Sequence, residues 1–364
     1  MRSCKKIAAF ILALVMICGM IPFGVLAAQP SEQTEPQYPF LDTSLSFEER
    51  AADLVSRLTV EEKINLLSSR RAEGVVGIPR LGIEAWSWGG EAAHGLSWMN
   101  SGTPVSSFPT GLAMSSSWNP DLITEVGSAI ADEARGLRKL IQETNNPDLA
   151  QLSGGALSFW APTINLARDP RWGRSDDNYG EDPYLTAQTA GGFVNGMQGD
   201  DEKYLKTVPA LKHFLANNSE WDRLFGNSVV DERSLREYYA KSFQELVENT
   251  GISQVMTAYN RVNGIPMAAH TDIVDTMLRK TWGFDGLVTT DCGAIGFMVN
   301  NHKWVPEGWD HSVDGAEAIA LSMQAGTDVN CGTYYVTYGM EALERGLITE
   351  QDLDRALLRA FTER

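Results

Sequence analysis

The sequence predicts an α/β fold, a TIM-like (β/α)8 barrel that is either irregular or short of one strand. Short apolar or β-branched runs alternate with amphipathic helical segments along most of the 364 residues. Repeated strand–helix units form parallel strands joined by crossover helices, and this many units at this length favour a barrel over an open sheet. No glycine-rich phosphate-binding turn follows any of these runs, which argues against a dinucleotide-binding fold.

The start of the chain is typical of a signal peptide at residues 1–28. A basic segment precedes the apolar run Ile7–Ile21, and Ala27 and Ala28 offer small residues for cleavage. The run is short for a membrane-spanning helix, so a retained anchor is the weaker alternative. We therefore expect a secreted, extracellular protein with no membrane association after the signal is cleaved.

The net charge and the number of cysteines limit which classes of partner and ligand we expect for this protein. The net charge of −17 becomes −20 when the three cations of the signal are removed, and so acidic a surface argues against a nucleic-acid partner. Cleavage also removes Cys4 and Cys18, leaving Cys292 and Cys331 in a compartment that permits a disulfide. Two cysteines make no metal site, and the five histidines lack metal-ligand spacing, so we expect no metal and no cofactor.

The elements follow a polar, proline-containing leader at 29–45 and fill a barrel domain at 46–364. Capping boxes are predicted to open helices at Ser46–Glu49, Thr59–Glu62 and Ser234–Glu237. Strands are expected near Glu84–Trp88, Gly111–Ser116, Phe159–Leu166, Ala210–Leu215, Gln254–Asn260, Leu287–Asp291 and Thr327–Asn330. Longer helices are expected near Asp121–Lys139, Pro183–Met197, Ser234–Glu248, Asp272–Lys280, Gly315–Gln324 and Tyr338–Arg345.

Chemically capable side chains cluster where these strands end, which is where barrel enzymes place their active sites. They are Glu91, His94, Arg168, Asp169, Arg171, Arg174, Lys212, His213, Met256, Tyr259, Asp291 and Asp328, with Trp86, Trp88, Trp98, Trp172 and Trp221 nearby. Charged groups beside aromatic platforms suit a sugar ligand. Retaining glycoside hydrolysis needs an ionised carboxylate that attacks and a protonated one that assists departure. Asp291 ends a β-branched strand and is the best nucleophile candidate. The alternative is a structural aspartate that caps the next helix or pairs with an arginine.

Several ordered motifs between about Leu58 and Arg355 resemble the N-terminal barrel domain of glycoside hydrolase family 3. They are Leu58–Lys63, Phe108–Ala113, Arg168–Arg174, Tyr179–Pro183, Lys212–Phe214, Val255–Asn260 and Trp282–Asp291. The segment Arg168–Arg174, which reads RDPRWGR, is the most distinctive of them. The resemblance implies a retaining exo-β-glycosidase that acts on terminal non-reducing sugars in plant polysaccharide breakdown.

The resemblance also implies a role for each matching position. Asp291 matches the nucleophile. The sugar-binding positions are matched by Glu91, Arg174, Lys212, His213, Met256 and Tyr259. Lys212 and Arg174 can donate to hydroxyl groups, and both cations favour an ionised Asp291. Alternatives remain: Lys212 as a Schiff-base lysine of an aldolase-like barrel, His213 as a buried hydrogen-bonded residue, and Met256 as packing.

Two departures from the family pattern bear on the substrate. Asp177 stands three residues after the signature arginine, where the family usually has glutamate, and this shorter carboxylate could displace Arg174 or Lys212. Cys292 follows the nucleophile where many β-glucosidases have tryptophan, which resembles the β-xylosidase branch. We expect an oligosaccharide or aryl β-glycoside substrate, with a β-xylosyl group favoured over a β-glucosyl group. A non-catalytic carbohydrate-binding barrel is the alternative from another class.

Two further expectations concern the surroundings of the nucleophile. Cys292 and Cys331 follow the ends of neighbouring strands, so we expect a disulfide beside the pocket, with two buried free thiols as the alternative. Two-domain members of the family supply the acid from a C-terminal domain, which we expect to be absent from this chain. Single-domain members use a histidine on a glycine-rich loop, and Leu215–Glu220 lacks both features. Glu220 is the nearby substitute.

Overall fold

The computed structural model describes residues 38–69, 75–86, 88–96, 105–144 and 157–364. The expected signal peptide and most of the expected leader lie outside these residues. The strands are β1 (Ser68–Ser69), β2 (Ser158–Phe159), β3 (Val208–Phe214), β4 (Asn227–Ser228), β5 (Gln254–Thr257), β6 (Arg261–Val262), β7 (Ile265–Pro266), β8 (Leu287–Thr290) and β9 (Asn330–Cys331).

Helices surround these strands and differ widely in length. The α-helices are α2 (Phe47–Ser56), α3 (Val60–Leu66), α4 (Gly111–Ser115), α5 (Pro120–Thr144), α7 (Pro183–Gln198), α8 (Glu232–Ser234), α9 (Lys241–Asn249), α10 (Ala294–Asn300), α11 (Gly315–Gln324), α12 (Tyr334–Glu344) and α13 (Glu350–Glu363). The wider or tighter helical segments are η1 (Pro39–Leu41), η2 (Pro79–Leu81), η3 (Ser175–Asp177), η4 (Leu235–Tyr239), η5 (Met267–Ala269) and η6 (Asp272–Thr281).

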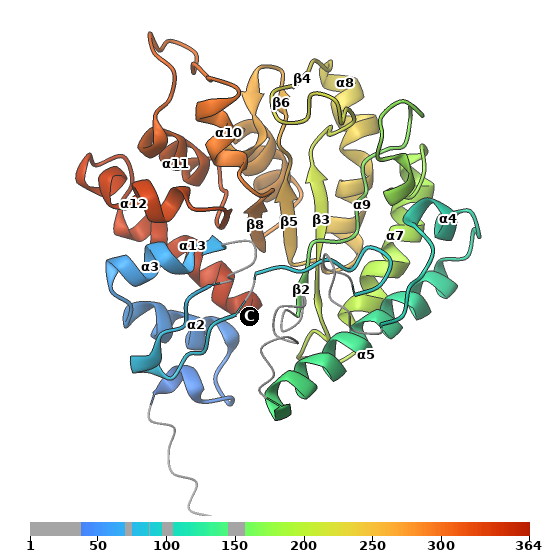
Figure 1. The fold of residues 1–364 in the computed structure, drawn as a ribbon, viewed down its shortest axis with the longest axis horizontal. Helices are drawn as coiled ribbons and strands as arrows, with labels where there is room; N and C mark the ends of the chain where they lie inside the picture. The colour runs from blue at the N-terminus through green and yellow to red at the C-terminus, as the bar shows by residue number, and fades with distance from the viewer. Residues whose placement is uncertain (1–37, 70–74, 87, 97–104, 145–156) are drawn as a thin grey trace, which may run out of the picture.

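The central sheet is parallel and runs β2-β3-β5-β8, with helices on both sides of it (Figure 1). Single parallel bridges extend it, from β2 to Gly90 and from β8 to Val329, the residue before β9. Strand β9 in turn pairs with β1 in parallel. Seven segments therefore follow one another in chain order around an irregular, incompletely hydrogen-bonded barrel. The indole N–H of Trp88 spans the remaining junction by donating to the Leu66 carbonyl at 3.0 Å.

The predicted fold class is confirmed, but the membership of the barrel differs at three places. The first strand was expected near Glu84–Trp88, but Trp86 pairs antiparallel with Val75 and the parallel bridge to β2 lies further along the chain, at Gly90. Gly111–Ser116 was expected to be a strand, and this expectation is wrong because the segment forms helix α4. A short apolar run cannot be assigned to strand or helix by periodicity alone. Here Gly111 sits so close to the Asn178 carbonyl that a Cβ atom would lie 2.9 Å from it, which allows the helix to dock there. The strand β1 was missed because its two residues, Ser68 and Ser69, carry no apolar signal.

The starts of three helices were predicted from capping boxes, and two of the three boxes are confirmed. Ser46 and Thr59 each accept from the backbone N–H three residues on, and the glutamate there returns the bond. The box at Ser234 is wrong, because the Asp231 side chain accepts from the Ser234 N–H and starts the helix one turn earlier. A carboxylate competes well with a hydroxyl for this position.

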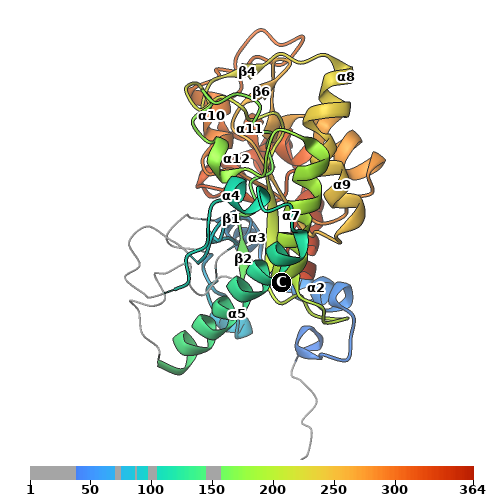
Figure 2. The ribbon, with the colours of Figure 1, turned by 90° about the vertical axis from the view of Figure 1, so that its right-hand side faces the viewer.

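Helices α5 and α7 cross closely on one side of the barrel (Figure 2). A Cβ atom at Gly192 would lie 2.4 Å from the Pro120 carbonyl oxygen, and one at Gly196 would lie 2.1 Å from that of Thr124. Only glycine permits this backbone approach. The tight contact fixes α7 against α5, and with it the end of the segment 157–182 that carries Arg174.

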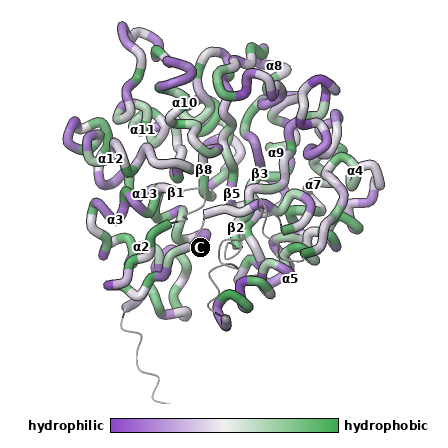
Figure 3. Tube along the Cα trace, in the orientation of Figure 1, coloured by the Kyte–Doolittle hydropathy of each residue, from purple (hydrophilic) through white to green (hydrophobic). Residues whose placement is uncertain are grey.

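Hydrophobic and hydrophilic residues alternate along the outer helices such as α5 (Figure 3). The buried residues of α5 include Ile123, Ile130 and Ala134. On β2 the alternation has period two. Phe159 packs outward into the main apolar core, while Ser158 and Trp160 face the barrel interior with Gln254 and Met256. These inward side chains form layers beneath the carboxyl ends of the strands, where the polar cluster lies.

Candidate active site

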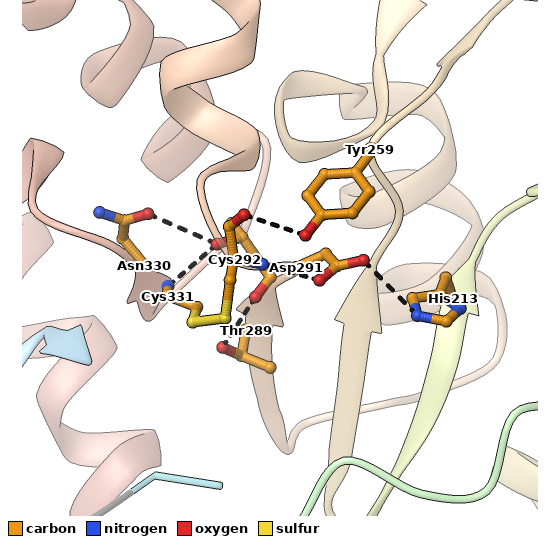
Figure 4. Close-up of a disulfide and its surroundings, with 8 residues drawn as sticks. His213, Tyr259, Thr289, Asp291, Cys292, Asn330 and Cys331 are labelled. Carbon is orange, nitrogen blue, oxygen red and sulfur yellow. Dashed lines mark hydrogen bonds and ion pairs between the residues drawn. A yellow bond between two sulfur atoms is a disulfide. The ribbon is translucent and has the colours of Figure 1, made fainter. Parts of the chain in front are cut away.

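Asp291 directly follows β8, and its backbone N–H donates to the Thr257 carbonyl of the neighbouring strand segment at 3.0 Å. Its carboxylate Oδ1 accepts from the Cys292 N–H at 2.7 Å, and Oδ2 lies 3.5 Å from His213 Nε2 (Figure 4). Burial raises the pKa of Asp291, while hydrogen bonds from Tyr259 and the Cys292 backbone lower it. The strand ladder therefore fixes this carboxylate in a partly desolvated, hydrogen-bonded frame.

Lys212 and Glu91 form an ion pair across the same end of the barrel. The Lys212 Nζ atom, on β3, lies 2.9 Å from Glu91 Oε2, and the lysine is almost fully buried. The other carboxylate oxygen of Glu91 accepts from the backbone N–H groups of Ala92 and Ala93. Lys212 is therefore held as a paired cation that contributes to lowering the pKa of Asp291.

Arg174 belongs to the loop that leads to α7, and Asp177 holds its guanidinium with two hydrogen bonds. Arg174 Nε and Nη2 donate to one Asp177 oxygen at 3.1 and 2.5 Å. Its Nη1 atom lies 3.5 Å from His213 Nε2, so the guanidinium also contacts His213, the residue beside Asp291. The shorter carboxylate at position 177 still reaches the arginine.

His213 is fully enclosed and lies between Arg174 and Asp291. Its backbone N–H donates to Asn165 Oδ1 at 2.9 Å, and its carbonyl accepts from the amide of the same residue. Burial, followed by the charges of Arg174 and Lys212, lowers its pKa well below the ordinary value. The imidazole is therefore neutral at physiological pH, which suits a hydrogen-bonding ligand to sugar hydroxyls.

Tyr259 and the disulfide complete the frame. The Tyr259 hydroxyl donates to the Cys292 carbonyl at 3.0 Å, and its ring contacts Phe297 edge-on at 5.4 Å. Cys292 and Cys331 are joined in the structure, with their Cα atoms 4.4 Å apart, as the strand order suggested. Met256 packs below them against Trp160 in the barrel interior, so a packing role is certain and sugar contact stays a prediction.

Several residues of the predicted cluster lie elsewhere. Asp328 is buried and bonded to Arg279 and Arg359, so it belongs to a structural ion cluster. Asp169 and Arg171 pair with each other at the surface, as a loop-holding pair would. Three of the expected aromatic platforms are not placed at the site either. Trp88 is a buried core residue, Trp221 is 91% exposed, and Trp98 lies outside the described residues.

The sequence analysis missed three residues that the structure brings to this site. Asn165 orients the His213 backbone, Trp160 packs with Met256 and Cys331, and Arg223 stacks on the Tyr259 ring with its Cζ atom 5.5 Å from the ring centre. Period-two alternation beyond Phe159 could have placed Trp160 inside the barrel. Nothing in the local sequence distinguishes Arg223 from a surface arginine.

A polar pocket of about 240 Å³ is lined in part by Arg223, Asp222 and Asn260. Segments 216–219 and 226–230 line it, together with Arg168 and Tyr239. Asp291 is not among its lining residues. In the described part of the chain no group of three or more His, Cys, Asp or Glu residues could hold a metal ion. Within the same residues no helix is long and apolar enough to cross a membrane.

The chain was compared with known proteins. Residues 50–362 match the model of the glycosyl hydrolase family 3 N terminal domain, and the chain belongs to this family. It is 34% identical to probable beta-D-xylosidase 7 of Arabidopsis thaliana over 96% of this chain and 46% of the relative. It is 36% identical to a xylan 1,4-beta-xylosidase of Xylanibacter ruminicola over 90% of this chain and 36% of the relative.

Solved structures give the same family assignment. A GH3 exo-beta-xylosidase, XlnD, in complex with a xylobiose aziridine activity-based probe is 31% identical, with a TM-score of 0.78 over 89% of this chain and 41% of that chain. A Bifidobacterium adolescentis GH3 beta-glucosidase is 32% identical, with a TM-score of 0.66 over 85% and 40%. The chain thus spans less than half the length of these relatives.

Proposed function

We propose that the chain is the nucleophile-bearing barrel of a retaining exo-β-glycosidase. The observation that carries the proposal is the setting of Asp291, whose carboxylate is mostly buried, bonded to a backbone N–H and to Tyr259, and influenced by the charges of Lys212 and Arg174. Two cations beside a desolvated carboxylate keep that carboxylate ionised in the presence of substrate. The polar groups around it converge as a sugar ring requires.

In the proposed reaction Asp291 attacks the anomeric carbon of a terminal non-reducing β-glycosyl group. A bond forms between the carboxylate oxygen and C1 as the bond from C1 to the aglycone oxygen breaks, and an acid donates the proton that the departing oxygen needs. Water then cleaves the glycosyl-aspartate with retention. Glu91, Lys212, Arg174 and His213 hold the sugar hydroxyls in this scheme.

The favoured glycosyl group is β-D-xylosyl. The support is the Cys292–Cys331 disulfide beside the nucleophile and the names of the similar proteins, several of which are xylosidases. A β-D-glucosyl group is the second candidate, because a beta-glucosidase of the family is about as similar in sequence. A barrel that binds sugars without turnover is the third.

One experiment separates these candidates. The purified chain is incubated with 2-fluoro-2-deoxy xylosides and glucosides that carry an activated leaving group, and the Asp291 peptide is examined by mass spectrometry. Covalent labelling of Asp291 is expected, faster with the xyloside. Binding of either sugar without labelling would leave only the non-catalytic barrel.

We also propose that residues 1–28 direct export and are removed. The basic start, the apolar run and the small residues before position 29 support this, as does a disulfide that an oxidising compartment would preserve. Sequencing the N-terminus of the secreted product tests it, and a cytoplasmic protein that keeps Met1 would contradict it.

A further inference from the structure

The segment after β3 carries a charge pair that the reaction scheme does not use. Arg223 Nη1 lies 2.5 Å from Glu220 Oε1. Glu220 is itself anchored, because its backbone N–H donates to the Trp172 carbonyl at 3.3 Å on the loop that carries Arg174. The arginine is therefore held by a fixed partner on the side of the site where the nucleophile's cations lie.

Arg223 reaches the site through an aromatic ring. Its Cζ atom lies 5.5 Å from the centre of the Tyr259 ring, within the range of a cation–π contact. A second contact on this ring comes from Phe297, whose ring centre lies 5.4 Å away at an interplanar angle of 67°. The Tyr259 hydroxyl has one proton and two acceptors that compete for it, the Cys292 carbonyl at 3.0 Å and the Asp291 carboxylate. Arg223 and Phe297 thus confine the ring that delivers this hydroxyl to the nucleophile.

We propose that Arg223, held by Glu220, is a positioning residue that tunes the nucleophile Asp291 through the Tyr259 ring. The inference rests on the proposed function for the role of Asp291, but its contacts are independent of it. The cation fixes the ring by attraction to its face. It also makes the phenol O–H a stronger hydrogen-bond donor, because a nearby positive charge stabilises the phenolate form and so makes the hydroxyl more acidic. A stronger donor favours the ionised carboxylate.

Other charged groups also act on Asp291, and the test must hold them constant. Lys212 and His213 face it from β3, and Arg174 faces it from the loop before α7. The Cys292 N–H faces it from its own segment. Removing Arg223 leaves all of these in place, and the charge of Arg223 is also felt by His213.

The experiment measures the protonation of Asp291 directly and needs no turnover. The carbon-13 chemical shift of the Asp291 carboxyl group is followed during a pH titration, and its midpoint gives the pKa. The signal is assigned by its loss in Asp291→Asn. Arg223→Gln is expected to raise this pKa by about 0.5, less than the 1–3 that a cation in direct contact produces. In a Tyr259→Phe background the same substitution is expected to shift it by less than half as much.

Controls separate this role from a general loss of structure. Arg233→Gln removes a matched arginine from an exposed pair with Glu237 and is expected to leave the titration unchanged. Arg223→Lys, which keeps the charge, is expected to restore part of the effect, and Glu220→Gln to reproduce part of it from the other end. An unchanged pKa in Arg223→Gln would overturn the proposal, as would an equal shift with and without the Tyr259 hydroxyl. Failure of fluorosugar labelling would instead overturn the proposed function and leave this titration valid.

Discussion

The surroundings of the Asp291 carboxylate increase its reactivity and reduce the stability of the folded protein. Burial is the largest influence on the pKa of Asp291 and raises it, while Tyr259, the Cys292 N–H and two cations oppose this. Active sites commonly carry such a cost, because a desolvated charge is reactive. The same residue should therefore show opposite effects on rate and on stability when its charge is removed.

The effect on rate follows from the covalent route. Asp291→Asn keeps the size of the side chain but removes the attacking oxygen, so the glycosyl-enzyme step is expected to fall by several orders of magnitude. Turnover of an activated aryl xyloside by wild-type and variant protein measures this, with sugar binding as the control for an intact pocket. Near-normal turnover by the variant would contradict the assignment.

The effect on stability depends on pH with a defined sign. Because the folded-state pKa of Asp291 is raised above 3.8, the native protein binds the proton more tightly than the unfolded chain does. The cost is absent below pH 3.8 and complete above the folded-state pKa. Asp291→Asn is expected to be more stable at neutral pH by about 1 kcal/mol, roughly 2 °C in Tm, with the difference vanishing in acid. Thermal melts across this range check it.

At the scale of elements, a buried charge cluster joins the last helix to the sheet. Asp328 accepts from Arg279 at 2.6 Å and from Arg359 of α13 at 2.8 Å, and it also accepts from the Val288 N–H in β8. Removing the shared carboxylate leaves two cations without it, one of them buried. Asp328→Ala is expected to lower the free energy of unfolding by about 3–5 kcal/mol. Denaturant unfolding measures this, and the exposed Asp310→Ala is a control expected to change little.

The disulfide links Cys292, in the segment after β8, to Cys331 at the end of β9, across 39 positions of sequence. Closing a loop of this size is expected to stabilise the protein by about 4 kcal/mol through the entropy of the unfolded chain. Thiol titration of the denatured, unreduced mature protein should find no free group. Detection of two free thiols would contradict the pairing, whereas a loss of stability in Cys331→Ser is the expected companion result.

These elements also show what the sequence could and could not predict. Repeated strand–helix units predicted the parallel barrel, because that signal is summed over the whole chain. Single elements failed where the signal was local: Gly111–Ser116 formed a helix, and Ser68–Ser69 formed a strand only through its pairing with β9. The site followed from strand ends and family motifs, whereas Arg223 entered through tertiary contact alone.

At the scale of the whole molecule, three carboxylates near the nucleophile are each held in an ion pair. In the described part of the chain Glu91 pairs with Lys212, Asp177 with Arg174 and Glu220 with Arg223. A retaining enzyme needs a proton donor about 5–5.5 Å from its nucleophile. The curated relatives that this chain matches are more than twice its length, which leaves them room for a further domain. We propose that such a domain supplies the acid.

The resulting prediction concerns leaving groups. Without a proton donor, glycosylation of Asp291 depends on how well the aglycone departs as an anion. The 364-residue chain is therefore expected to cleave an activated aryl β-xyloside slowly and to barely act on an alkyl β-xyloside or a xylo-oligosaccharide. Initial rates on both substrate types, with Asp291→Asn as the control for background hydrolysis, give the comparison. Efficient cleavage of both would place an acid within the chain, and Glu220→Gln would then be the first variant to test, because Glu220 lies on the loop beside Arg174.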